Sequence, residues 1–85
     1  MTLEEIKKLP AEEAIKALDA RLTANPSDDA ALTLRGMRHW ALSHRSLAIK
    51  DYLAAVRNNP DSPAAMLLQN ANDILGFYNK DLLNP

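Results

Sequence analysis

The chain has 85 residues, which suits one small domain, and 47% of them are hydrophobic. It has no cysteine, which excludes a disulfide framework, and no apolar run approaches the roughly 20 residues that a bilayer span needs. Acids exceed bases by three in residues 1–29 and by two in residues 61–85, whereas residues 30–60 carry a net +4. This acidic–basic–acidic order does not resemble a nucleic-acid binder, which usually has a net basic face.

The composition predicts an all-α protein. Only 5% of the residues are aromatic, and alanine and leucine dominate the apolar set. Both are strong helix formers, whereas β-branched and aromatic residues favour strands. The N-terminus MTLEEIKKLP has two glutamates and no long apolar segment, so it is not a secretory signal. We therefore expect a cytoplasmic location and no membrane partner.

Two helices are predicted before the first Asn-Pro pair. The stretch Thr2-Leu-Glu-Glu5 has the form of a capping box, which predicts a short helix over about 3–8. Pro10 suits the first position of a second helix, where its missing N–H costs nothing. That helix should end near residue 24, because the residue before Pro26 is disfavoured in the α conformation.

Three further helices are predicted, which gives five in all. Ser27 suits the N-cap of the third helix, which should stop around Ser43-His44. The fourth begins near Ser46 and runs to Asn58.

The last helix is predicted to begin at Ser62, as its N-cap, with Pro63 at its first position. It ends at Gly76 or near Asn79.

One phrase occurs twice in the sequence. NPSDDAAL at 25–32 returns as NPDSPAAM at 59–66, so that Pro26 and Pro60 stand 34 residues apart. A period of this length with helix–turn–helix units is typical of the tetratricopeptide repeat. The family pattern W-x2-L-G-x2-Y, A-x3-F, P falls on Leu32, Arg35, Gly36, His39, Ala48, Tyr52 and Pro60, with Ala55 as a further small residue. The chain thus resembles that family, although Arg35 and His39 depart from the pattern.

The resemblance implies antiparallel helical hairpins in a short right-handed superhelix. It divides the single domain into a partial unit at 1–28, a complete unit at 29–62, a half unit or capping helix at 63–79 and a tail at 80–85. The last helix is expected to cap the array, because the face that would pack on a following helix is largely polar.

In this family the first helix of each unit presents an inner face. That face would contain Thr33, Met37, Trp40 and Ala41 in the complete unit, and Leu67, Ala71, Ile74, Leu75 and Tyr78 in the half unit. Fewer than about three stacked repeats usually bury too little surface to be stable alone. We therefore expect self-association, most simply as a homodimer, through Met37, Trp40, Leu67, Ile74, Leu75 and Tyr78.

Two other arrangements of the inner face stay open. A monomeric adaptor would hold a peptide or helix of another protein in the same groove. Alternatively, the N-terminal helix or the Leu82-Leu83 tail would fold over the face. Trp40 suits either an interface anchor or a core residue.

The basic middle of the chain offers a second candidate contact. Arg35, Arg38 and Arg45 lie near His39 and His44 and could receive an acidic partner, although charged residues usually remain solvated. The carboxylate clamp with which some tetratricopeptide modules bind chaperone tails is absent, because its places hold Ala30, Thr33, Leu34 and Met37.

No chemistry of catalysis or metal binding is predicted. His39 and His44 are five residues apart, not the four that places two imidazoles on one helix face. Ser43 and Ser46 lack a positioned base and oxyanion donors, and two glycines cannot make a phosphate-binding loop. We expect neither an enzyme nor a cofactor.

Overall fold

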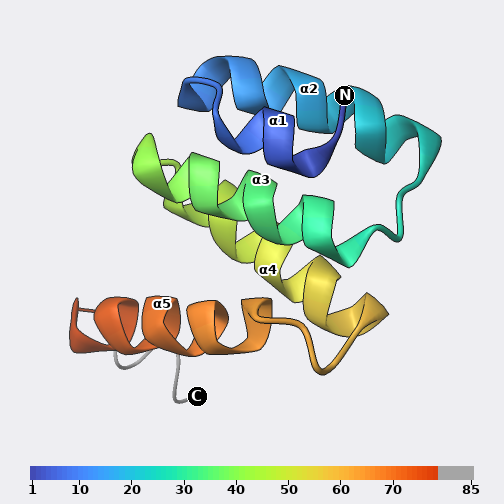
Figure 1. Ribbon diagram of the computed structural model, residues 1–85. Helices are drawn as coiled ribbons and strands as arrows, with labels where there is room; N and C mark the ends of the chain where they lie inside the picture. The colour runs from blue at the N-terminus through green and yellow to red at the C-terminus, as the bar shows by residue number, and fades with distance from the viewer. Residues whose placement is uncertain (79–85) are drawn as a thin grey trace.

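The protein is all-helical over the residues that the structure describes. The computed structural model describes the backbone of residues 1–78 and the side chains of residues 1–71 and 73. Within this part, the helices are α1 (Leu3–Lys7), α2 (Ala11–Ala24), α3 (Asp29–Ala41), α4 (Arg45–Asn58) and α5 (Ala64–Tyr78). Each helix packs against its neighbour in the sequence, and consecutive helices run in roughly opposite directions (Figure 1).

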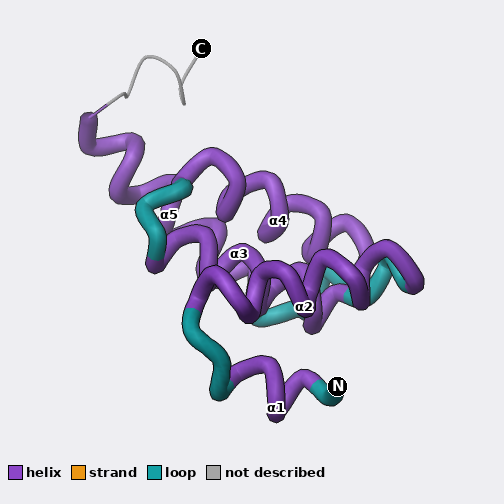
Figure 2. The backbone as a smooth tube through the Cα atoms, turned by 90° about the horizontal axis from the view of Figure 1, so that it is seen from above, coloured by secondary structure: helices purple, strands orange, loops and turns teal. Residues whose placement is uncertain are grey.

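The first two helices follow their local sequence signals. The Thr2 hydroxyl accepts the Glu5 N–H at 3.2 Å, and the Glu5 carboxylate accepts the Thr2 N–H at 2.9 Å. The capping box is thus confirmed, and the backbone hydrogen bond to Thr2 is the main cause that lowers the pKa of Glu5. Pro10 is the N-cap of α2 and not its first residue, so the helix begins at Ala11, one residue later than predicted. The loop at 8–10 is short, and α1 lies beside α2 (Figure 2).

Asp28, and not Ser27, is the N-cap of α3. Its carboxylate accepts the Ala31 N–H at 3.1 Å and also the Arg21 Nε–H at 2.9 Å. Burial would raise the pKa of Asp28, but the hydrogen bonds from Arg21 and Ala31 outweigh it and hold the pKa below its usual value. A carboxylate paired with a cation from the preceding helix therefore replaces the neutral hydroxyl that we predicted.

The turn between α3 and α4 begins earlier than the sequence predicts. Its backbone hydrogen bonds are His44 N to His39 O at 2.8 Å and Ser43 N to Trp40 O at 3.0 Å. These bonds form a Schellman motif, in which the residue after the C-cap takes a left-handed conformation. That residue is Ser43, with φ 64°, and the helix ends at Ala41 because the motif closes there. Glycine usually takes this place, so a serine there does not predict the motif.

The N-terminus of α5 is close to the prediction. The Ser62 hydroxyl accepts the Ala64 N–H at 3.1 Å, and Pro63 immediately precedes the helix. The backbone stays helical through Gly76 to Tyr78, so Gly76 does not end it. Asn79 and the tail at 80–85 lie outside the described residues.

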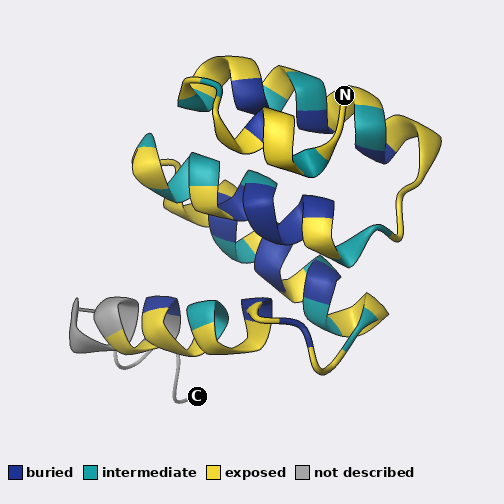
Figure 3. Ribbon diagram, viewed as in Figure 1, coloured by how far each residue is buried: buried dark blue, intermediate teal, exposed yellow. Residues whose placement is uncertain are grey.

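The core lies where the small residues allow the helices to approach (Figure 3). Ala48, Tyr52 and Ala55 of α4 are buried against α3. A Cβ added to Gly36 would lie 2.5 Å from Tyr52 Cε1 and 3.2 Å from the Ala48 carbonyl oxygen. The two helices therefore cross closely at this point, which explains why position 36 has no side chain.

The described helices were compared with the length and hydropathy of a membrane-spanning helix. Within residues 1–78, none of them has both the length and the apolar character that crossing a bilayer requires.

Candidate functional site

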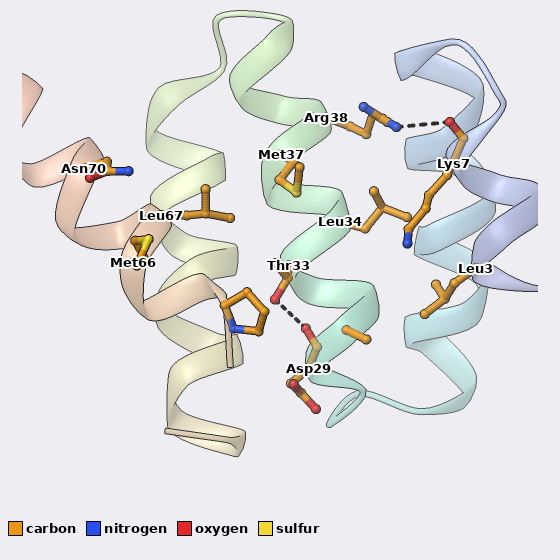
Figure 4. Close-up of a pocket in the computed structure, with 12 residues that line it drawn as sticks. Leu3, Lys7, Asp29, Thr33, Leu34, Met37, Arg38, Met66, Leu67 and Asn70 are labelled. Carbon is orange, nitrogen blue, oxygen red and sulfur yellow. Dashed lines mark hydrogen bonds between the residues drawn. The ribbon is translucent and has the colours of Figure 1, made fainter. Parts of the chain in front are cut away.

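An open apolar groove lies between α1, α3 and α5 (Figure 4). Its volume is about 680 Å³, which is within the range of peptide and ligand sites. Its floor is α3, and α1 and α5 form its two walls. The lining residues are Leu3, Lys7, Asp29, Ala30, Thr33, Leu34, Met37, Arg38, Pro63, Met66, Leu67 and Asn70.

The α1 wall is held in place by one buried side chain and one long polar contact. Ile6 is 1% exposed and belongs to the hydrophobic core, so its burial anchors α1 on the rest of the domain. The Arg38 Nη2 donates to the Lys7 carbonyl oxygen at 3.2 Å, which joins the C-terminal end of α1 to α3. The N-terminal helix therefore stands beside the apolar surface of α3 and leaves the groove open.

The α5 wall is joined to α3 through two hydroxyl groups. The Thr33 hydroxyl lies 2.8 Å from the Asp29 carbonyl oxygen, to which it donates its proton. Because that proton is used, Ser62 is the donor in the 3.1 Å contact between the Thr33 and Ser62 hydroxyl groups. Asn59 also donates to the Asp29 carboxylate at 3.2 Å. These contacts lie at the start of α5 and fix its position against α3.

The polar residues of the groove lie at its edges. Arg38 and Lys7 stand at one end, and Asp29 stands at the other (Figure 4). The Lys7 ammonium pairs with Glu4 at 3.1 Å in an exposed contact, and Asp29 accepts from Asn59. An exposed ion pair such as Lys7–Glu4 stabilises a protein by less than about 1 kcal/mol and can exchange for a ligand. The groove therefore has an apolar middle with a cationic end.

The structure separates the predicted partner-binding residues into three groups. Met37, which is 42% exposed, and Leu67 line the groove. Trp40 instead packs against the core, with the Arg45 guanidinium 4.7 Å from its ring centre. The side chains of Ile74, Leu75 and Tyr78 lie outside the described part of the structure, although their backbone belongs to α5.

Sequence reasoning missed part of the lining. Leu3 and Lys7 stand 34 residues before Met37 and Ala41, so the same period, applied to the N-terminal helix, would have found them. It also aligns Ile6 with Trp40, and both pack into the core. Met66 and Asn70, which were not among the residues predicted for the inner face, also line the groove, whereas Ala71, which was predicted for that face, is buried.

The three arginines of the predicted basic cluster lie in different environments. Arg35 makes a bidentate pair with Asp51, at 2.9 and 2.8 Å, and a third contact with Asp19 at 3.0 Å. The hydrogen bonds to Asp51 raise the pKa of Arg35. Arg38 belongs to the groove, and Arg45 stacks on the ring of Trp40.

The Arg35–Asp51 pair explains both departures from the repeat pattern. The Asp51 side chain is only 6% exposed, and a buried carboxylate needs a charged partner. His39 adds its Nε2 atom at 3.9 Å from Asp51. Burial lowers the pKa of His39, and the opposing attraction of Asp51 is weaker. Arg35 and His39 thus serve the packing of α3 against α4.

The histidine pair has limited capacity to hold a metal. The Nδ1 atoms of His39 and His44 lie 3.4 Å apart. Among the described residues, however, no group of three or more His, Cys, Asp or Glu side chains could surround an ion. The candidate binding site is the groove between α1, α3 and α5, whose lining is mainly apolar.

Comparison with known proteins adds no assignment. No family model, curated protein or solved structure matches the chain. The function must accordingly be argued from the groove itself.

Proposed function

We propose that this chain is a small tetratricopeptide-like interaction module that binds protein, and that it associates with copies of itself through the groove. The 34-residue period and the close crossing at Gly36, Ala48 and Tyr52 support the repeat architecture. The observation that carries the binding function is the open groove between α1, α3 and α5. Contiguous apolar surfaces are uncommon on monomers and usually mark contacts with other molecules.

The residue types in the groove favour binding over catalysis. Its middle consists of Leu34, Met37, Met66 and Leu67, which offer shape and apolar contact but no nucleophile or general base. Methionine side chains also adapt to different partner shapes, because they are unbranched and polarisable. The titratable pair of His39 and Asp51 lies between α3 and α4, and neither residue lines the groove.

Sedimentation velocity from about 1 µM to about 1 mM tests self-association, because this range covers weak and moderate dimers. We expect a dimer that forms with rising concentration. Met37→Asp and Met66→Asp should abolish it, since these side chains are 42% and 70% exposed and can change without disturbing the core. The matched controls are Leu47→Asp and Leu53→Asp, at exposed apolar positions of α4 that do not line the groove.

Two results would overturn self-association. The first is a monomer at every concentration, which would leave a module that binds a segment of a different protein. The second is an equal loss of dimer in the groove variants and in the α4 controls. Circular dichroism of each variant shows whether the fold has survived, so that a loss of dimer is not a loss of structure.

A further inference from the structure

We propose that the segment filling the groove is the C-terminal half of α5 from a second copy, exchanged reciprocally between two chains. This inference rests on the proposed self-association and identifies the element that performs it. It combines the shape of the groove, the sequence of α5 and the charge at the two surfaces.

The groove requires a convex occupant. Two copies of a concave surface cannot fill one another, so a projecting element must enter each groove. On α3 the lining runs from Asp29 to Arg38, which corresponds to about 13 Å at 1.5 Å per residue. A helical segment of about nine residues has this length. Residues 72–78 of α5, which follow the buried Ala71, span about 9 Å along the helix axis and would occupy most of that length.

The C-terminal half of α5 has the sequence of an apolar helix. Residues 74–78 read ILGFY, the densest cluster of large apolar residues at the end of a helix in this chain. The C-terminal end of α5 extends past the ends of the other helices in both views (Figures 1 and 2). Phe and Tyr each bury about 150–250 Å² when enclosed. The two aromatic residues of both copies would thus supply about 600–1,000 Å², about half of the roughly 1,200–2,000 Å² that a specific interface buries.

The occupant must come from a second copy. Pro63, Met66, Leu67 and Asn70 of α5 already form one wall of the groove in their own chain. Residues 74–78 continue the same helix and cannot turn back into the groove that this helix borders. A two-fold arrangement in which each chain inserts its helix end into its partner fills both grooves and leaves neither open. Such an interface is isologous and closes as a dimer.

Charge favours the same pairing. The groove has Lys7 and Arg38 at its cationic end, and α5 carries the exposed Asp73 beside its apolar end. Residues 61–85 carry −2 against +4 for residues 30–60. Complementary charge of this kind steers two copies together and sets the direction in which the helix enters.

A charge-swap experiment tests the exchange. Met37→Lys places a cation in the groove, and Leu75→Asp places an anion on the inserting helix. Each variant alone should raise the dimer Kd by about tenfold or more, because a charge meets an apolar partner. An equimolar mixture should restore association, because one groove then pairs lysine with aspartate and the other keeps its native contacts. Tyr78→Asp, at the end of the helix, is a second variant should Leu75→Asp reduce helicity.

Disulfide trapping gives an independent readout. The chain has no cysteine, so Met37→Cys with Leu75→Cys introduces the only two thiols. On mild oxidation we expect a covalent dimer, and a Leu47→Cys/Leu75→Cys control should stay monomeric on a non-reducing gel. Three outcomes overturn the inference while leaving self-association standing: a dimer unaffected by Leu75→Asp and Tyr78→Asp, no rescue in the mixture, or equal crosslinking in the control. A wild-type monomer would overturn the proposed function instead.

Discussion

The close crossing of α3 and α4 at Gly36 predicts that Gly36→Ala destabilises the protein. The added Cβ would lie 2.5 Å and 2.7 Å from two carbons of the Tyr52 ring, more than 0.8 Å inside the usual carbon–carbon contact of about 3.5–4.0 Å. Tyr52 is 3% exposed, so its ring cannot move away into solvent. Overpacking of this kind costs about 1–3 kcal/mol, and we expect the upper end here.

A gain in helix propensity partly offsets that cost. Alanine is better than glycine inside a helix by about 1 kcal/mol. The net loss in the free energy of unfolding should therefore be about 2 kcal/mol. For a domain of this size, such a loss lowers Tm by about 10 °C. Urea unfolding followed by circular dichroism at 222 nm measures it directly.

A double variant separates the two contributions. Tyr52→Leu alone should destabilise the protein by about 2–4 kcal/mol, because it removes a buried ring. In that background the clash is gone, so Gly36→Ala should stabilise by up to about 1 kcal/mol. Ala20→Gly, at an exposed position within α2, reports the propensity contribution on its own. The reasoning is refuted if Gly36→Ala stabilises the wild-type protein, or if its effect is the same in both backgrounds.

Three further predictions concern the α3–α4 pair. Arg35→Ala should destabilise the protein by about 3 kcal/mol, because it leaves the buried Asp51 carboxylate without a partner. The double variant Arg35→Ala/Asp51→Ala should lose less free energy of unfolding than the sum of the losses in the two single variants. The pKa of His39 in the folded protein is below its usual 6.5, so the stability that its neutral form contributes is fully present above pH 6.5 and declines as the pH falls below that value. Urea unfolding between about pH 7.5 and pH 5 should show this decline in the free energy of unfolding. The decline should be smaller in His39→Gln. Ser43→Gly should stabilise the protein by up to about 1 kcal/mol in the same assay, because glycine adopts the left-handed conformation without a steric cost.

Each of these has a clear contrary result. Strict additivity of the Arg35 and Asp51 substitutions would mean that the pair contributes no mutual stabilisation. Stability that rises on acidification from pH 6.5 would contradict the sign argued for His39. A loss of stability in Ser43→Gly would mean that the Ser43 side chain makes contacts whose value exceeds the backbone strain.

The helices and the inner surface could be predicted because their signals are local or periodic. The capping box at Thr2, the prolines at three of the four helix connections and the 34-residue spacing each depend on residues that are close in the sequence or regularly repeated. Met37 and Leu67 were found in this way, and both line the groove.

The remaining features depend on contacts that no short pattern encodes. Asp51 is the only acid in residues 30–60, but its pairing with Arg35 depends on how α4 is rotated against α3. Trp40 belongs to the same helix face as Met37 by spacing, yet the stacking of Arg45 and the core direct it inward. The end of α3 was misplaced because Ser43 occupies the position where glycine is expected.

The contact between the Thr33 and Ser62 hydroxyl groups, which joins α3 to the start of α5, sets the width of the groove. Thr33 and Ser62 meet at the N-terminal end of α5, a helix of 15 residues that is about 22 Å long. A small rotation of α5 about this contact therefore produces a larger displacement at its other end. A rotation of α5 by about 5° at this contact would move the C-terminal end of the helix by about 2 Å, which is about half the diameter of a methyl group. Substitution of Ser62, which does not line the groove, would therefore change which side chains the groove admits without altering any residue that touches them.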